Sequence, residues 1–481
     1  MQEERVTKRF GLLSATMIGV GAIVETTLFI MVGHAAEMAG PGVVITFLMG
    51  AIVNYFAALN YSELAAAIPI TGGGYAFTKE AIGKFPAFIN GWFIWLGTIF
   101  YCALCALGVA YGVRYFFPAV DVSSVAVIVV LVFMIANLKR TKGFENALEY
   151  LTLAVIGICA LFIILGLFHG PRADAFVNIA PHGWPAIFTT TGYIFICFIG
   201  FSVIPTCCEE IKDPGKNVPR AILLSLTIGT IIYVLITYVA VGTTPIEDLA
   251  LSSTPLSEVG KVMLGSTGAH MMAIGMILAS LAGCNSSMLA TTRVMFALSR
   301  DGYFPFALSR IHEKLKTPYL TVAICSSMIA IFSAVGIAEL VSYAADFGYL
   351  ISFALVNYSV ILFRRKHPTI NRPFKVPFYP VVPLLGVAFS LILLLILPTL
   401  HPEALALGSI LAAIGLLAYY ISMLGYTRLR IAFGGMTVAM GFVISMAPIL
   451  MWYGFIPTFS PPLLFFIGIL QILVGFLNIT G

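Results

Sequence analysis

The stretch FGLLSATMIGVGAIVETTLFIMVG, from Phe10 to Gly33, decides the fold class of this chain. It is long and apolar enough to cross about 30 Å of hydrocarbon, which takes roughly 20 residues of α-helix. Yet Gly19, Gly21 and Glu25 stand near its centre, and paired glycines with a carboxylate make a poor plain membrane anchor. We therefore expect a transmembrane helix that is interrupted at mid-membrane.

A second stretch of this kind is FTTTGYIFICFIGFSVIPTCCEE, residues 188–210. Gly200 and Ser202 lie near its centre, and Pro205 follows a turn later, where a proline removes one helix hydrogen bond. This is the sixth apolar span, five after the first, and two interrupted spans at that separation are typical of inverted-repeat transporters. In a simpler interpretation, which stays open, the glycines only permit close packing and the proline only kinks the helix.

Composition extends this prediction to the whole chain. Of 481 residues, 60% are hydrophobic and 10% are charged, in apolar blocks longer than the helices of a soluble core. We predict an all-α integral membrane protein with about fourteen transmembrane helices. The predicted spans begin near residues 10, 41, 88, 122, 146, 186, 219, 266, 318, 340, 379, 403, 431 and 461.

The basic residues predict the orientation. With the N-terminus inside, 23 of the 26 Lys and Arg residues fall on inner segments, and Arg114, Arg172 and Lys261 fall outside. Short loops rich in Lys and Arg stay cytoplasmic, so residues 1–9 are expected to be a cytoplasmic N-terminus. We expect no removable signal peptide and a multi-pass protein of the cell membrane.

Several classes of function are disfavoured. The net charge of +5 is not gathered on one soluble segment, so we expect no nucleic-acid partner, and protein partners stay open. The seven histidines are scattered and the eight cysteines show no metal-ligand spacing, which argues against an enzyme and a bound cofactor. We see no selectivity-filter repeat of a channel. A receptor that senses amino acids stays open as an alternative.

The chain resembles the amino acid, polyamine and organocation (APC) permease superfamily over about residues 7–400. The similarity is carried by GVGAIVETTLF (Gly19–Phe29), YSELAAAIPITGGGYAFTKEAIG (Tyr61–Gly83), FIGFSVIPTCCEEIKDPGKNVPRAI (Phe198–Ile222), RVMFALSRDGYFP (Arg293–Pro305) and RPFKVPFYPVVPLLG (Arg372–Gly386). The resemblance implies two inverted five-helix repeats, residues 10–168 and 186–366, with discontinuous helices 1 and 6. Residues 379–481 would form four additional helices, as in relatives of the cationic amino acid transporters.

The resemblance also implies a substrate site at the two interrupted helices, and with it alternating access. Its predicted residues are Gly19, Gly21, Ala22, Glu25, Thr26, Thr27, Cys197, Phe198, Gly200, Phe201 and Ser202. The family receives a substrate carboxylate on the first unwound backbone, with glycines where this chain has Glu25 and Thr27. An ionised Glu25 would repel that carboxylate, so it is expected to contact a substrate amine, to carry a proton, or to make a structural hydrogen bond.

In the sixth span, the carbonyl groups near Cys197 to Gly200 are candidates for the substrate ammonium group. Phe198 and Phe201 are expected to close over the substrate. Ser202 stands where many relatives have Asp, so it gives no guidance on the substrate side chain.

The coupling ion is predicted to be sodium or a proton. A candidate sodium site combines carbonyls near Gly19, Ala22 and Ala282 with Asn285 and Ser286. Proton-coupled relatives often have a lysine in the fifth span, and Val155 takes that position here.

An inner gate is expected from Glu63, Glu209 and Glu210, paired with arginines such as Arg293 or Arg300. Together these features predict an ion-coupled symporter or exchanger of an amino acid. A transporter of polyamines or other organic amines, without carboxylate recognition, is the alternative.

Overall fold

The computed structural model describes residues 10–70, 72–139, 142–312, 317–400 and 402–424. These residues are almost entirely helical and form no β-strand beyond one isolated bridge between Phe10 and Ile211. The first part contains α1 (Leu12–Ile23), α2 (Thr26–Ala39), η1 (Gly40–Gly42), α3 (Val43–Ala67), α4 (Gly73–Ala81), α5 (Lys84–Phe116), α6 (Val122–Lys139) and α7 (Lys142–His169). An all-helical membrane protein, as the sequence predicts, is confirmed.

The second part begins again with an interrupted helix. Its elements are α8 (Trp184–Tyr193), η2 (Phe195–Glu210), α9 (Pro214–Thr243), α10 (Ile246–Leu251), α11 (Pro255–Leu264), α12 (Ser266–Arg300), η3 (Phe306–Ser309), α13 (Tyr319–Ala334), α14 (Ala338–Lys366), α15 (Val381–Leu400) and α16 (Pro402–Leu424). Both predicted interruptions are present, since α1 and α2 are separate helices and α8 gives way to the 3₁₀ helix η2.

The predicted spans agree with these helices. Twelve predicted starts can be compared with helices of the structure. Those near residues 122 and 266 coincide with the first residues of α6 and α12, and the other ten lie within five residues of the start of a helix. Eight helical stretches in the described part are long and apolar enough to cross a membrane, and four shorter apolar helices accompany them. The spans predicted near residues 431 and 461 lie outside the described residues, and the inverted-repeat relation stays a prediction.

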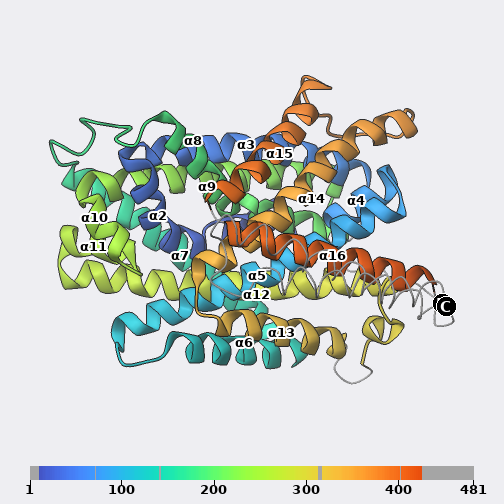
Figure 1. The fold of residues 1–481 in the computed structure, drawn as a ribbon, viewed down its shortest axis with the longest axis horizontal. Helices are drawn as coiled ribbons and strands as arrows, with labels where there is room; N and C mark the ends of the chain where they lie inside the picture. Colours follow the sequence, from blue (N-terminus) through green and yellow to red (C-terminus); the bar gives the residue numbers. More distant parts are fainter. Residues whose placement is uncertain (1–9, 71, 140–141, 313–316, 401, 425–481) are drawn as a thin grey trace, which may run out of the picture.

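The long helices run roughly along one axis of the molecule (Figure 1). α5 is buried almost throughout and packs along α12, whereas α6 and α7 lie at the periphery with much of their apolar surface exposed. Because exposed apolar faces are unfavourable in water, this pattern fits a surface solvated by lipid chains. The buried centre of the bundle therefore lies along α5.

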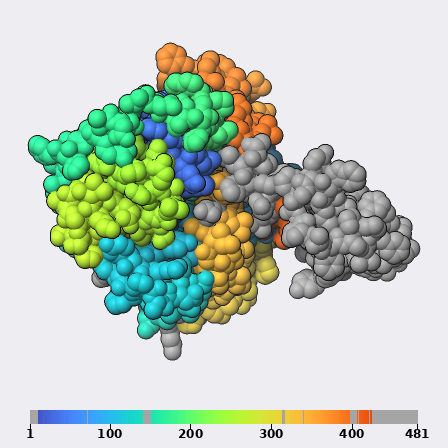
Figure 2. All heavy atoms as spheres, turned by 60° about the vertical axis from the view of Figure 1, so that its left-hand side comes forward, coloured from blue at the N-terminus to red at the C-terminus, as the bar shows by residue number. Residues whose placement is uncertain are grey.

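The two ends of the bundle differ. α4 and the C-terminal ends of α3, α12 and α14 gather at one end, which we call the inner end after the orientation that the basic residues predict. α10 and α11 lie at the opposite, outer end (Figure 1). Figure 2 shows the side of the molecule with α10 and α11, where residues coloured green and lime leave little of the blue N-terminal helices visible.

Candidate functional site

The first helix breaks at two residues, Val24 and Glu25, which separate α1 from α2. The carbonyl of Ile23 at the end of α1 accepts hydrogen bonds from the Glu25 N–H (3.0 Å) and from the Tyr233 hydroxyl of α9 (2.9 Å). Because that bond uses the one hydroxyl proton of Tyr233, the Thr27 hydroxyl is the donor in the 2.8 Å bond between Thr27 and Tyr233. Tyr233 thus bridges both sides of the break.

Glu25 is completely buried at the start of α2. Its Oε1 atom has no hydrogen-bond partner, its Oε2 atom lies 3.9 Å from the thiol of Cys105, and the hydroxyl group of Tyr101 faces the carboxyl group across the cavity. Gly283 of α12 packs so closely that a Cβ atom there would overlap Oε2. No Lys, Arg or His in the described part forms an ion pair with Glu25. Since an ionised buried carboxylate without a partner is very unfavourable, this geometry fits a neutral carboxyl group.

The second break lies earlier than the sequence suggested. The interruption was expected around Gly200 and Ser202, but α8 ends at Tyr193, and the 3₁₀ helix η2 continues through Gly200 to Glu210. A 3₁₀ helix of 16 residues is unusually long. Gly200 serves close packing instead, because a Cβ atom there would overlap the carbonyl of Ala22. The missing side chain lets η2 lie directly on the end of α1.

Where the two broken helices meet, they enclose a small central cavity of about 10 Å³. A space of this size holds about one water molecule and has no room for an amino acid. It is lined by Ala22 and Glu25, by Thr98 and Tyr101 of α5, by Gly200 and Ser202 of η2, by Ser286 and Ser287 of α12, and by Tyr349 of α14. The structure therefore shows this centre closed, with polar groups from both breaks facing one point.

The remaining predicted substrate residues pack around this cavity and do not line it. Gly19 faces Ile204 and Ser225, Gly21 faces Thr152, and Thr26 lies beside Gly108. The Cys197 thiol lies 3.7 Å from the Met31 sulfur. Phe198 packs against Phe47 and Tyr233, and Phe201 against Tyr61 and Phe353. In this closed arrangement both phenylalanines belong to aromatic clusters beside the cavity.

Of the predicted sodium ligands, the structure brings Ala22 and Ser286 to the same cavity. The side chain of Asn285 is directed elsewhere, since its Oδ1 atom accepts a hydrogen bond from Asn137 of α6 at 3.3 Å. Ala282 is half-buried on α12. Val155, which takes the place of the lysine of proton-coupled relatives, is buried on α7.

Ion pairs connect helices at the inner end. Arg293 of α12 lies 3.3 Å from Glu210 at the end of η2, which is the expected pairing. Glu63 of α3 pairs with a different arginine than expected: Arg364 of α14 binds its two oxygens at 2.7 and 2.6 Å, and Arg372 lies 3.7 Å away. The reason is topological, because α3 and α14 end side by side. Glu209 is exposed.

A third pair at this end joins α4 to the C-terminus of α12. Lys79 donates to Asp301 at 2.6 Å, and Tyr75 donates to the same carboxylate oxygen. Partial burial alone would raise the pKa of the Asp301 carboxyl, but these hydrogen bonds outweigh it and hold that pKa below its ordinary value. The three pairs thus join α4 and η2 to α12, and α3 to α14.

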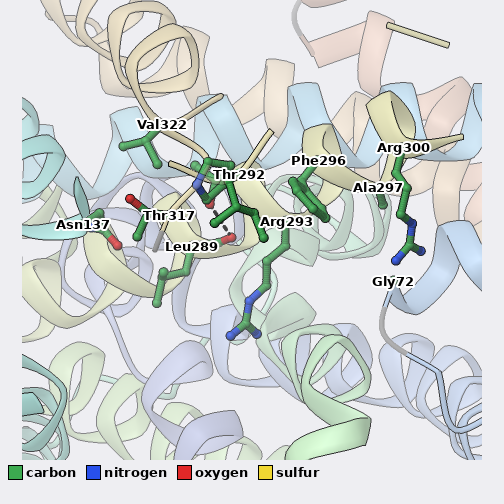
Figure 3. Close-up of a pocket in the computed structure, with 12 residues that line it drawn as sticks. Gly72, Asn137, Leu289, Thr292, Arg293, Phe296, Ala297, Arg300, Thr317 and Val322 are labelled. Carbon is green, nitrogen blue, oxygen red and sulfur yellow. Dashed lines mark hydrogen bonds between the residues drawn. The ribbon is translucent and has the colours of Figure 1, made fainter. Parts of the chain in front are cut away.

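A larger pocket of about 240 Å³ lies next to these pairs (Figure 3). Arg293, Phe296 and Arg300 of α12 line it, with Asn137 of α6 and Thr317 on the other side. On α12, Ser286 and Ala290 line the central cavity, and Arg293 follows one turn later on the same helix face. The Arg293–Glu210 pair therefore lies on the inner side of the cavity, at the wall of the pocket.

The outer end is closed by other segments. A Cβ atom on Gly33 of α2 would overlap the carbonyl of Leu249 in α10, and one on Gly40 would overlap Pro181 of the segment before α8. Gly40 also has a φ of 65°, which ends α2 before Pro41. Contacts thus cover the central cavity from both ends of the bundle.

Sequence reasoning missed two groups of this site. Tyr233 is one of many aromatic residues in apolar spans, and nothing in the sequence distinguishes it from a packing residue. Asp346 lies fully buried in α14. A single acidic residue inside an apolar span indicates a functional site, and this could have been recognised from the sequence.

A bundle of membrane-spanning helices, two of them broken around a closed polar centre, defines a membrane transporter. A family model described as amino acid permease matches residues 10–419, and the chain belongs to this family within the APC superfamily. It is 30% identical to the branched-chain amino acid permease BcaP of Bacillus subtilis, over 82% of this chain and 89% of the relative. The amino-acid permease RocE of the same organism is 27% identical, over 79% and 86%.

Another relative is named for a different substrate. The methylthioribose transporter of Bacillus subtilis is 27% identical, over 84% of this chain and 91% of the relative. The family thus identifies a transporter and leaves the substrate to be inferred from the site.

Proposed function

We propose that this protein is a secondary active transporter that carries an α-amino acid across the cell membrane by alternating access, with a proton as the coupling ion. The N-terminus lies in the cytoplasm, as the distribution of Lys and Arg predicts. The names of BcaP and RocE support an amino acid as the substrate. The single observation that carries the proposal is the buried Glu25 without a cationic partner.

The break in the first helix supplies both poles that an amino acid requires. The first N–H groups of α2 have no partner within their helix and form its positive end, which favours a substrate carboxylate. The last carbonyls of α1 form the negative end of that helix and favour the ammonium group. A neutral Glu25 between them does not repel the substrate carboxylate, so proton binding at Glu25 precedes substrate binding.

Coupling follows from the same carboxyl group. When the centre opens to the inner side, water reaches Glu25, the ionised form becomes less unfavourable, and the proton leaves. The ionised carboxylate then repels the substrate carboxylate and promotes release. Sodium is the competing ion. The hydrogen bond between Asn285 and Asn137 favours the proton as the coupling ion. Asn285 was expected to be a side-chain ligand of sodium, and its Oδ1 atom accepts this hydrogen bond instead.

The alternative substrate is an organic amine without a carboxylate. The unpartnered Oε1 atom of Glu25 favours it, because an ammonium group could occupy that position. Thermal stabilisation of the purified protein by a panel of α-amino acids, polyamines and simple amines, with and without sodium, separates these functions. Stabilisation by α-amino acids alone, independent of sodium, supports the proposal. Stabilisation by amines that lack a carboxylate would replace it with the alternative.

A further inference from the structure

Asp346 of α14 is a second carboxyl group in the membrane interior. Its side chain is completely buried, and neither of its oxygens has a hydrogen-bond partner. No Lys, Arg or His in the described residues pairs with it. Acids inside membrane helices are rare and normally functional, and an unpaired one is very unfavourable when ionised. Asp346 is therefore not explained by packing.

The surroundings of Asp346 place it at the second broken helix. The backbone N–H of Ile196, at the start of η2, is directed at the carboxyl group without reaching hydrogen-bond geometry. The thiol of Cys197 is close enough for the charge of Asp346 to act on it. Each break thus has one buried carboxyl group beside it: Glu25 at the start of α2, and Asp346 at the start of η2.

Other ionisable groups around this turn are weak acids. Tyr343 and Tyr349 lie three residues to either side of Asp346 on α14, and Tyr101 of α5 contacts the ring of Tyr349. Tyr193 of α8 contacts the ring of Tyr343. From α3, α4, α15 and α16, which also pack against α14, no charged side chain of the described residues acts on Asp346. A metal ion would need several further ligands here, whereas a proton needs only the carboxyl group. A proton is therefore the cation that fits this enclosed site.

Asp346 is also positioned to communicate with the central cavity. Tyr349, one helical turn along α14, lines that cavity with Glu25. The turn of Asp346 lies on the outer side of it, because α14 runs from the outer end to the inner end. A proton that enters from outside therefore meets Asp346 before the level of the cavity.

We propose that Asp346 is a second proton-binding site, so that two protons accompany each substrate molecule, one on Asp346 and one on Glu25. This inference rests on the proposed function. When Asp346 loses its proton, its charge attracts the N–H groups at the start of η2, the positive end of that helix. Binding a proton removes this attraction. Because η2 contacts α1 at Gly200, the protonation of Asp346 changes the packing of both broken helices.

Infrared spectroscopy tests proton binding directly on the unaltered protein. The other five aspartates (Asp121, Asp174, Asp213, Asp248 and Asp301) lie in loops, at helix ends or in the short helix α10, outside the interior of the long helices. Labelling all aspartates with ¹³C shifts their carboxylic-acid bands and leaves those of glutamates in place. Exposed aspartates are ionised at neutral pH, so we expect a ¹³C-shifted acid band at neutral pH that disappears in Asp346→Asn. Its absence from the wild-type protein would overturn the proposal.

Transport in proteoliposomes tests the coupling. At zero membrane potential, the logarithm of the accumulation ratio rises with the pH gradient with a slope equal to the number of protons per substrate. We expect Asp346→Asn to lower this slope by about one, and the exposed Asp174→Asn to leave it unchanged. An unchanged slope in Asp346→Asn would overturn the inference while the proposed function stands. Wild-type protein that shows no amino acid counterflow would instead refute the proposed function. If Asp346→Asn shows no transport, the infrared titration decides whether Asp346 binds a proton.

Discussion

Gly200 of η2 lies so close to Ala22 of α1 that a single added Cβ atom would overlap the Ala22 carbonyl. The two broken helices therefore meet backbone to backbone, immediately beside Glu25 and the central cavity. Because no flexible side chain lies between the two backbones, a shift of one helix displaces the other. It is the structural basis for coupling between the two breaks.

Gly200→Ala is expected to abolish or severely reduce transport. The methyl group would force η2 away from α1, and backbone atoms cannot yield as a side chain would. Uptake and counterflow in proteoliposomes measure the effect. Gly157→Ala in α7 is the matched control, because its added methyl group meets no atom within 4 Å. Equal transport by both variants would show that the close contact is dispensable.

Tyr233→Phe removes the hydroxyl that joins the Ile23 carbonyl to Thr27. Two buried hydrogen bonds are lost, so we expect a destabilisation of about 1 to 2 kcal/mol and a reduced transport rate. Thermal unfolding in detergent and uptake measure the two effects. Tyr238→Phe on the same helix is the control, since the ring of Tyr238 stacks on Phe176 and stays in place. If Tyr233→Phe keeps wild-type stability and uptake, the hydroxyl group of Tyr233 does not act as a bridge across the break.

Glu63→Gln breaks the pair with Arg364. The carboxylate is fully buried and Arg364 is only 20% exposed, so removal of one partner should cost about 3 to 5 kcal/mol. The expected readouts are a lower unfolding temperature and a lower yield of folded protein. Asp174→Asn disrupts a surface pair with Arg172 and should change stability little. A Glu63→Gln protein as stable as Asp174→Asn would contradict the structural role of this pair.

Glu210→Gln weakens the pair with Arg293, which lies on the inner side of the cavity at the wall of the pocket. Loss of a partly exposed pair costs on the order of 0.5 to 1 kcal/mol, which raises the open population roughly two- to five-fold. Cys207 contacts Arg293 at 2.8 Å, and its rate of alkylation by a maleimide should rise accordingly. Cys102, buried in α5, is the internal control. An unchanged labelling ratio between the two cysteines would exclude a gate at this pair.

The fold could be predicted largely because membrane helices obey simple rules. The length of each apolar segment predicted where its helix starts. Gly19, Gly21 and Glu25 predicted the first break to within a few residues. The second break was placed too late, since Gly200 and Pro205 were interpreted as interrupting the helix. Gly200 has a packing role that becomes visible only once α1 is beside it.

Partners across the bundle were harder to predict than positions along it. The acidic residue Glu63 was identified, but its partner Arg364 is 301 residues away, and several arginines were equally plausible from the sequence. The same limit applies to Tyr233, whose role depends on the Ile23 carbonyl. Asp346 is different, because a lone acid in an apolar span can be recognised without a structure.

The central claim, proton-coupled transport of an amino acid through Glu25, is tested most directly by uptake into proteoliposomes under an inward proton gradient without sodium. We predict accumulation of an α-amino acid that a proton ionophore abolishes, and a shallower dependence on the pH gradient in Glu25→Gln. Accumulation that requires a sodium gradient, or a Glu25→Gln variant with the same pH dependence as the wild-type protein, would contradict the claim.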